Sequence, residues 1–175
     1  VELPTGKAVC VGRNYVDHIH ELNNPVPDEP LLFIKPDTAL ADMNEPLLIP
    51  QGNCHNELEI ALLIARPLRA NTHYTPDEIR SSLWGVGLAL DLTLRDKQSE
   101  LKQKGHPWER AKAFDNSCPL SAFVPCVEAP DLQEIPFELS VNDDIRQSGN
   151  TRLMLNDCLS CLLYTSPSPR DSDQS

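Results

Sequence analysis

Three acidic residues, Glu57, Glu59 and Asp91, stand beside apolar runs and are the best candidates for chemistry in this sequence. The two glutamates are separated by one residue, Leu58, and lead into the apolar run 60–64, which is typical of a strand. Because strand side chains alternate between faces, both carboxylates would share one face and repel each other unless a cation lay between them. Asp91 ends a second apolar run, 85–90, and could bring a third carboxylate to the same place. Three carboxylates with room for water predict a hard-cation site, with Mg²⁺ as the first choice.

The same residues have a simpler interpretation. A Glu-x-Glu pattern is common on the solvent-exposed face of an edge strand, and the pair alone favours that reading. His18 and Glu21 are three residues apart, so their side chains would meet on one face of a helix, but such pairs are also common at protein surfaces. The metal-site prediction therefore depends on the motifs that accompany Glu57 and Glu59.

Short strands with helices inserted between them are the elements expected to position these residues. Apolar or alternating runs predict strands at 7–12, 31–34, 47–50, 57–65, 84–92 and 137–141. Helix-start patterns occur at Asn14 and Thr75, and a further helix is expected over 95–104, before Gly105. A turn at 142–144 predicts a hairpin after the last strand. We expect one α+β domain that is mainly β.

The composition limits the classes of partner. A chain of 175 residues is long enough for one domain with a hydrophobic core, and none of its apolar runs approaches the roughly 18 residues of a membrane span. The net charge of −11 argues against nucleic acid and acidic membranes as partners. Of six cysteines only Cys158 and Cys161 have C-x-x-C spacing, which favours reduced thiols over a zinc site. No signal peptide is visible, so we expect a cytoplasmic protein.

Six short motifs follow one another along about residues 7–157. They are Gly12-Arg13-Asn14-Tyr15 with His18 and Glu21, Phe33-Ile34-Lys35-Pro36, Glu57-Leu58-Glu59, Asp91-Leu92-Thr93-Leu94-Arg95-Asp96, Gly105-His106-Pro107-Trp108 and Lys112-Ala113-Phe114-Asp115. Each motif is weakly specific, but the ordered set resembles the fumarylacetoacetate hydrolase superfamily, in particular its small acylpyruvate hydrolase branch.

The resemblance implies a fold, a cofactor and a set of site residues. The implied fold is a mixed β-roll or sandwich with short inserted helices, usually in a homodimer. The implied cofactor is Mg²⁺ or Mn²⁺. The resemblance assigns the site residues to three roles: metal ligands Glu57, Glu59 and Asp91, catalytic residues His18, Glu21 and Lys112, and substrate contacts Arg13, Tyr15, Arg95 and Gln98.

The reaction implied is hydrolysis of the C–C bond of an acylpyruvate, such as acetylpyruvate or fumarylpyruvate, to pyruvate and a carboxylic acid. His18, oriented by Glu21, would take a proton from the attacking water, and Lys112 would offset charge on the acyl oxygen. Arg95 and Gln98 would hold the carboxylate of this 2-oxo acid. Two rival reactions remain open on the same scaffold: decarboxylation or tautomerisation of oxaloacetate, and an isomerase or hydratase step of the homoprotocatechuate pathway.

The end of the sequence differs from the rest. Residues 158–175 finish in a polar stretch rich in Pro and Ser, which resembles translated vector sequence or a disordered tail. Family members continue into a Gly-Asp segment and a Thr-Gly-Thr-Pro loop that close the β-roll, and neither follows residue 157. We therefore expect a partial catalytic domain over 1–157, without its closing C-terminal strands, and a foreign or disordered tail over 158–175. A non-catalytic truncated chain is the alternative to an enzyme.

Overall fold

The computed structural model describes residues 6–15, 27, 29–69 and 72–165. The chain divides into two compact units. The first unit comprises Val1–Val9, Ile34–Ala61 and Val86–Phe123. The second unit comprises Cys10–Phe33, Leu62–Gly85 and Val124–Ser175. The helix expected after Asn14, with His18 and Glu21, lies outside the described residues.

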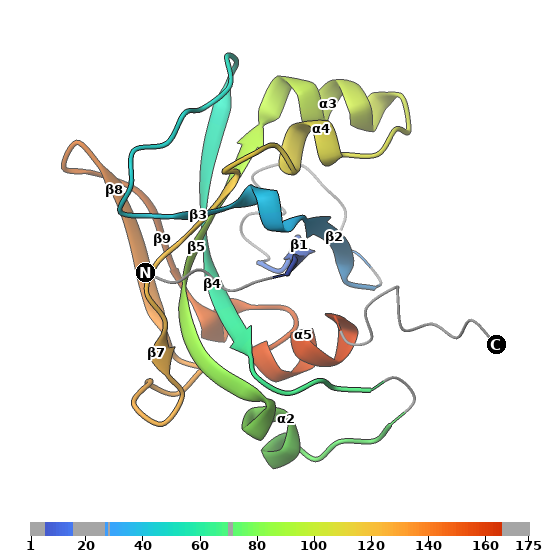
Figure 1. The fold of residues 1–175 in the computed structure, drawn as a ribbon, viewed down its shortest axis with the longest axis vertical. Coiled ribbons are helices and arrows are strands. Elements are labelled where there is room, and N and C mark those ends of the chain that lie inside the picture. The colour runs from blue at the N-terminus through green and yellow to red at the C-terminus, as the bar shows by residue number, and fades with distance from the viewer. Residues whose placement is uncertain (1–5, 16–26, 28, 70–71, 166–175) are drawn as a thin grey trace. The chain divides into compact units, whose positions relative to one another are not determined.

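Most residues of a sheet with the strand order β3-β6-β5-β4 belong to the first unit (Figure 1). The bounds of its strands are β3 Leu40–Asp42, β4 Cys54–Ile64, β5 Leu83–Leu94 and β6 Cys118–Leu120. Strand β3 is parallel to β6, with Leu40 opposite Cys118, and β6 is antiparallel to β5, with Leu120 opposite Ala89. The two long strands β4 and β5, which carry the predicted acidic residues, are therefore neighbours.

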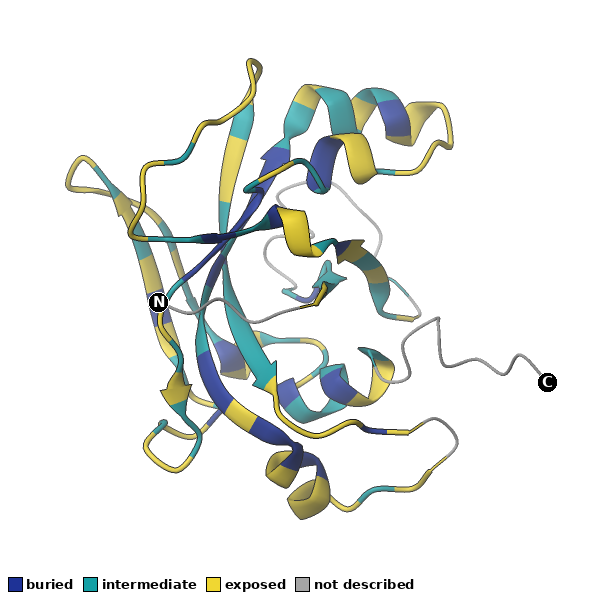
Figure 2. Ribbon diagram, viewed as in Figure 1, coloured by how far each residue is buried: buried dark blue, intermediate teal, exposed yellow. Residues whose placement is uncertain are grey.

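One hydrophobic cluster in the core of the first unit joins side chains from neighbouring elements. Its buried members are Ala39, Ala89, Cys118 and Leu120, and Phe123 packs against them. A Cβ at Gly87 would lie 3.0 Å from the ring of Phe123, so glycine permits this close packing. Most of β5 is buried or half-buried (Figure 2), which fits a strand with neighbours on both sides.

Two helices of the first unit lie side by side (Figure 1). Helix α3, Arg95–Gln103, begins directly after β5, and its end before Gly105 confirms the predicted stop. Gly105 has φ 64°, a left-handed conformation that glycine adopts without a steric penalty. Helix α4, Glu109–Lys112, is a single turn that carries Lys112 at its last position. The 3-10 helix η1, Asp37–Ala39, precedes β3.

The second unit contains the predicted hairpin and the predicted capped helix. Strands β8 Pro136–Val141 and β9 Asp144–Asn150 are antiparallel, and both turn residues have positive φ: 52° at Asn142 and 68° at Asp143. Such φ values characterise the two-residue hairpin turn that Asn and Asp favour. Helix α2, Pro76–Ser82, starts at a capping box in which the Thr75 and Glu78 side chains each accept a hydrogen bond from the other's backbone N–H.

Four further elements complete the strands and short helices of the described residues. Strand β7, Val124–Pro125, pairs with β5, and the 3-10 helix η2 spans Thr151–Leu153. Strands β1 Ala8–Gly12 and β2 Leu31–Lys35, both expected from their apolar runs, pair with each other in a separate two-stranded sheet. The described elements are mainly strands with short helices between them, which agrees with the expected α+β class.

The strand predicted at residues 47–50 is wrong. These residues form no strand, and Leu48 is 89% exposed. Pro46 and Pro50 flank the apolar residues and remove backbone donors, which disfavours pairing in a sheet.

Residues 158–165, which we expected in a foreign or disordered tail, form helix α5, Cys158–Thr165. Cys158 and Leu162 are buried one helical turn apart, and Asp157 Oδ1 accepts a hydrogen bond from the Ser160 N–H at 2.8 Å. The described part of the expected tail is thus helical, because it presents apolar side chains at helical spacing after a capping aspartate. Its foreign origin stays a prediction.

Two expectations from the composition concern cysteines and membranes. The six cysteines are free thiols in the structure, and two of them, Cys118 and Cys158, are buried. No helix in the described part of the chain is long and apolar enough to cross a membrane.

Candidate active site

The ammonium group of Lys112 joins two of the three predicted carboxylates. Its Nζ lies 2.9 Å from Glu57 Oε2 and 2.5 Å from Asp91 Oδ2. Glu57 comes from β4, Asp91 from the neighbouring strand β5 and Lys112 from the end of α4. All three belong to the first unit, and the Lys112 side chain is only 6% exposed. The site therefore brings together Glu57, Asp91 and Lys112, as the sequence suggests.

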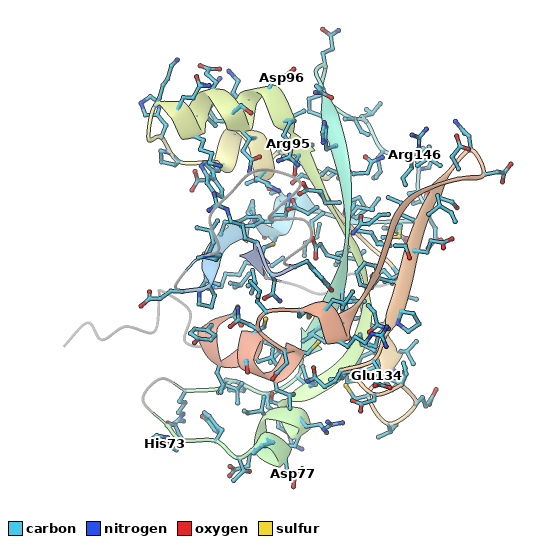
Figure 3. The ribbon with its side chains drawn as sticks, turned by 180° about the vertical axis from the view of Figure 1, so that it is seen from behind. His73, Asp77, Arg95, Asp96, Glu134 and Arg146 are labelled. Carbon is cyan, nitrogen blue, oxygen red and sulfur yellow. The ribbon has the colours of Figure 1, made fainter. Side chains whose placement is uncertain are left out.

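Arg95 holds the other oxygen of Glu57. Its guanidinium forms an ion pair with Glu57 Oε1, and its Nη1 donates to Gln98 Oε1 at 2.6 Å. Arg95 opens α3, directly after β5 (Figure 3), and Gln98 follows on the same helix face. Thr93 Oγ1 is a third donor to Glu57, 3.2 Å from Oε2. Two cations and a hydroxyl thus hold the Glu57 carboxylate in place.

The two glutamates of β4 have opposite pKa shifts. Burial alone would raise the pKa of Glu57, but Lys112 and Arg95 outweigh it and lower the pKa to about 2. Burial raises the pKa of the half-buried Glu59 to about 8, and the negative charges of Asp91 and Glu57 act in the same direction, while Lys112 opposes them. The cluster therefore contains one firmly ionised glutamate and one whose negative charge is poorly compensated.

Lys35 is a site residue that sequence reasoning assigned no role. Its side chain is fully buried, and its Nζ lies 2.9 Å from Asp91 Oδ1. The sequence contains one indication of this role, a lysine that ends an apolar strand and is fixed by a following proline, Pro36. That pattern is equally typical of a strand that ends at the surface, so burial of Lys35 becomes visible only in the folded chain.

The residues present fit a divalent cation by the chemistry of their donors. Carboxylate oxygens, which Glu57, Glu59 and Asp91 supply, are the ligands that Mg²⁺ and Mn²⁺ prefer. Within the described ranges, no group of three or more His, Cys, Asp or Glu side chains is gathered closely enough to hold one ion. The Lys112 ammonium instead occupies the position between Glu57 and Asp91. A divalent cation that used both carboxylates would therefore have to displace that ammonium.

Four predicted site residues are not part of this cluster as described. Arg13 and Tyr15 belong to the second unit, where Arg13 has a left-handed φ of 56° and the Tyr15 ring lies edge-on to Phe137, with 6.0 Å between centroids. His18 and Glu21 lie outside the described residues. The roles assigned to these four residues stay predictions.

Comparison with known proteins identifies the family. The family model "Fumarylacetoacetate (FAA) hydrolase C-terminal" matches residues 7–169. The chain belongs to the fumarylacetoacetate hydrolase family.

Two relatives are named oxaloacetate tautomerase. The chain is 48% identical over 169 residues to YcgM of Escherichia coli (strain K12), with 95% of this chain and 76% of that protein covered. It is 44% identical over 149 residues to mitochondrial FAHD1 of Bos taurus, with 84% and 66% covered. The chain thus spans about two thirds to three quarters of the length of these relatives.

Solved structures share the fold. A putative fumarylacetoacetate hydrolase family protein from Yersinia pestis CO92 is 45% identical, with a TM-score of 0.89 over 95% of this chain and 76% of that one. Fumarylpyruvate hydrolase from Pseudomonas aeruginosa, in complex with Mn²⁺ and pyruvate, is 27% identical, with a TM-score of 0.82 over 92% and 71%. These similarities confirm the expected family and its mainly β, α+β fold.

The expectation of acylpyruvate hydrolysis is corrected by the same comparisons. The relatives at 48% and 44% identity are named oxaloacetate tautomerases, whereas the fumarylpyruvate hydrolase is only 27% identical. The physical reason for the error is that both reactions proceed through an enolate. Residues that stabilise an enolate therefore produce the same motifs in either enzyme, and the rival interpretation, oxaloacetate chemistry, is the one favoured.

Proposed function

We propose that the intact protein interconverts the keto and enol forms of oxaloacetate. Sequence identities of 48% and 44% to two proteins named oxaloacetate tautomerase support this proposal. The structural observation that carries it is the Lys112 ammonium fixed beside Glu57 and Asp91. Keto and enol forms exchange through an enolate, and a preoriented positive charge stabilises the negative charge that develops on it.

Tautomerisation moves one proton from the carbon beside the keto group to the keto oxygen, and it consumes no water. Burial would lower the pKa of Lys112, but Asp91 and Glu57 outweigh it and raise the pKa, so Lys112 stays protonated at neutral pH. Lys112 can therefore stabilise an enolate oxygen but cannot take the proton from carbon. For that step we keep His18, paired with Glu21, as the candidate base.

We also propose that Glu57, Glu59 and Asp91 hold a divalent cation, Mg²⁺ or Mn²⁺, which on binding would displace the Lys112 ammonium from its position between Glu57 and Asp91. The donor chemistry suits either ion, and the fumarylpyruvate hydrolase structure contains Mn²⁺. Such a cation, when bound, acts as a Lewis acid toward the keto oxygen of a 2-oxo acid. It would also compensate the negative charge that raises the pKa of Glu59.

Arg95 is the proposed contact for a substrate carboxylate. Two of its guanidinium nitrogens are engaged by Glu57 and Gln98, while its Nε is buried without a hydrogen-bond acceptor among the described residues. A buried donor without an acceptor is costly, and a carboxylate is a strong acceptor for a guanidinium. Oxaloacetate has two carboxylates, one of which could accept from this nitrogen.

The test follows oxaloacetate through two signals at once, the ultraviolet absorbance of its enol and the release of pyruvate. The proposal predicts fast, chelator-sensitive relaxation of the enol signal without matching pyruvate release. Lys112→Met should abolish most of the acceleration of keto–enol exchange, whereas Lys104→Met, the same substitution at the exposed residue directly after α3, should not. Pyruvate release as fast as the loss of enol would instead show a decarboxylase and would refute the tautomerase proposal.

A further inference from the structure

Lys35 has an unusual environment for a lysine. It is the last residue of β2, and its side chain has no exposed surface. Oxygen atoms from three parts of the first unit surround its Nζ: Asp91 Oδ1 at 2.9 Å, Leu92 O at 3.4 Å, Ser117 O at 3.0 Å, Ser117 Oγ at 3.2 Å, and Lys112 O in closer contact still. An ammonium group has three N–H donors, so this shell satisfies all of them.

A buried ammonium is retained only where it is paired and fully hydrogen-bonded. Within the described residues, Asp91 is the only carboxylate that forms an ion pair with Lys35. The hydrogen-bond acceptors of Lys35 are three backbone carbonyls and one hydroxyl, which are neutral, whereas Asp91 Oδ1 lies at ion-pair distance and accepts no hydrogen bond among the described residues. The position of Lys35 is therefore set by Asp91 and by the backbone around Lys112 and Ser117.

The contacts of Lys35 fix the orientation of the Asp91 carboxylate. Lys35 forms an ion pair with Oδ1 at 2.9 Å, and the opposite oxygen, Oδ2, lies 2.5 Å from Lys112 Nζ. With Oδ1 held from behind, rotation of the carboxylate about its Cβ–Cγ bond would break an ion pair with a buried cation. Oδ2 is thus kept directed at the Lys112 ammonium, which also contacts Glu57.

The same ammonium also positions the backbone that carries Lys112. Lys35 donates to the carbonyl of Lys112, and Ser117 Oγ donates to that carbonyl as well, at 2.8 Å. One buried cation therefore ties the end of α4 to β5, and it fixes at the same time the two groups that meet in the site, the Asp91 carboxylate and the Lys112 side chain.

We propose that Lys35 is a positioning residue for the active site, which acts by orienting Asp91 and by anchoring the backbone of Lys112. The inference rests on the proposed function of this cluster. Lys35 itself is sealed from solvent and does not touch a substrate. Its effect on the reaction passes through the two residues that it holds.

The test compares Lys35→Met with Lys104→Met. Methionine has nearly the length of lysine without the charge, and Lys104, directly after α3, is 56% exposed and pairs with Glu100. Oxaloacetate tautomerisation, Mn²⁺ binding by calorimetry and thermal unfolding are measured for both variants. Loss of partners around a ligand-bearing carboxylate costs about 10- to 100-fold in activity or metal affinity. We expect a loss of that size in kcat and in Mn²⁺ affinity for Lys35→Met, with KM nearly unchanged, and no loss for Lys104→Met.

The direction of the Mn²⁺ effect separates positioning from simple electrostatics. Lys35 is a positive charge close to Asp91, so removing it without any other change would strengthen the binding of a cation. Weaker Mn²⁺ binding therefore supports positioning when the variant still unfolds cooperatively and the binding is measured well below its Tm. Binding that is unchanged or stronger, with kcat unchanged, overturns the proposal.

A second variant covers the case in which Lys35→Met does not fold. Ser117→Ala removes one acceptor of Lys35 and the hydroxyl donor to Lys112 O but leaves the buried cation in place. Like Lys35→Met, Ser117→Ala should reduce both kcat and Mn²⁺ affinity, here by several-fold. Wild-type values of both quantities would overturn the proposal. A wild-type chain that binds Mn²⁺ but leaves oxaloacetate unchanged would refute the tautomerase function, while the Mn²⁺ titrations of the variants would still decide the role of Lys35.

Discussion

Replacing Glu57 by glutamine should remove a large, pH-dependent contribution to stability. Burial opposes ionisation of Glu57, but Lys112 and Arg95 lower its pKa from 4.5 to about 2. A difference of about 2.5 pKa units corresponds to about 3 kcal/mol of free energy of unfolding. The Glu57 side chain is 17% exposed, so solvent screens it only weakly. Because the folded-state pKa is lowered, this contribution is complete above pH 4.5 and is lost as the pH falls through about 2.

Urea unfolding of both proteins at a series of pH values, from neutral to about 2, measures this contribution. The wild type should lose about 3 kcal/mol more than Glu57→Gln between the two pKa values. Glu100→Gln is the matched control, since Glu100 also has a pKa of about 2, caused by hydrogen bonds from Lys104 and then Lys97, but lies on the exposed surface of α3. Solvent and salt should screen that pair, so the control should follow the wild type. Parallel pH profiles for the wild type and Glu57→Gln would refute the proposed ion-pair energetics.

Three further outcomes are expected. Lys112→Met should lower kcat for enol conversion by about 100-fold, because a charge-stabilising donor is lost, whereas equal rates would remove Lys112 from the mechanism. Burial and its acidic neighbours raise the pKa of Glu59 to about 8, so stability without divalent cations should fall as the pH rises from 4.5 to about 8. Excess Mg²⁺ should abolish this loss of stability, measured as Tm in thermal melts. The Glu59→Gln variant should show no such loss. Arg95→Lys should raise KM by about 10-fold through loss of the planar donor fork, and an unchanged KM would exclude a carboxylate contact at Arg95.

Local patterns predicted the elements that carry the three candidate carboxylates. Strand alternation places Glu57 and Glu59 on one face, and the end of an apolar run places Asp91 on the next strand. Helix α3 follows from its sequence because Gly105 provides a stop. In each case the interaction that fixes the structure is short in sequence, so periodicity and turn chemistry are sufficient.

Nonlocal features could not be predicted in this way. The short strands β3 and β6 have only three residues each, and they exist because they pair with one another across the fold. The apolar run 47–50 has the composition of a strand but lies between prolines and finds no partner. Burial of Lys35 depends on oxygens from residues 91–117, far along the chain. The reaction was mispredicted for a chemical reason, since hydrolysis and tautomerisation share an enolate.

The balance of charges in the cluster implies cooperative binding. Three carboxylates, Glu57, Glu59 and Asp91, accompany three cations, Lys35, Lys112 and Arg95, so the cluster is neutral when Glu59 is ionised and carries one positive charge when burial keeps Glu59 protonated. A divalent cation alone adds two positive charges to the ionised cluster, and a dicarboxylate alone adds two negative charges. Each ligand therefore compensates the charge that the other introduces, and by thermodynamic linkage each should tighten the binding of the other by the same factor. Oxaloacetate, as a dianion, has the charge needed for this reciprocal effect, whereas a substrate with a single carboxylate would couple only half as strongly.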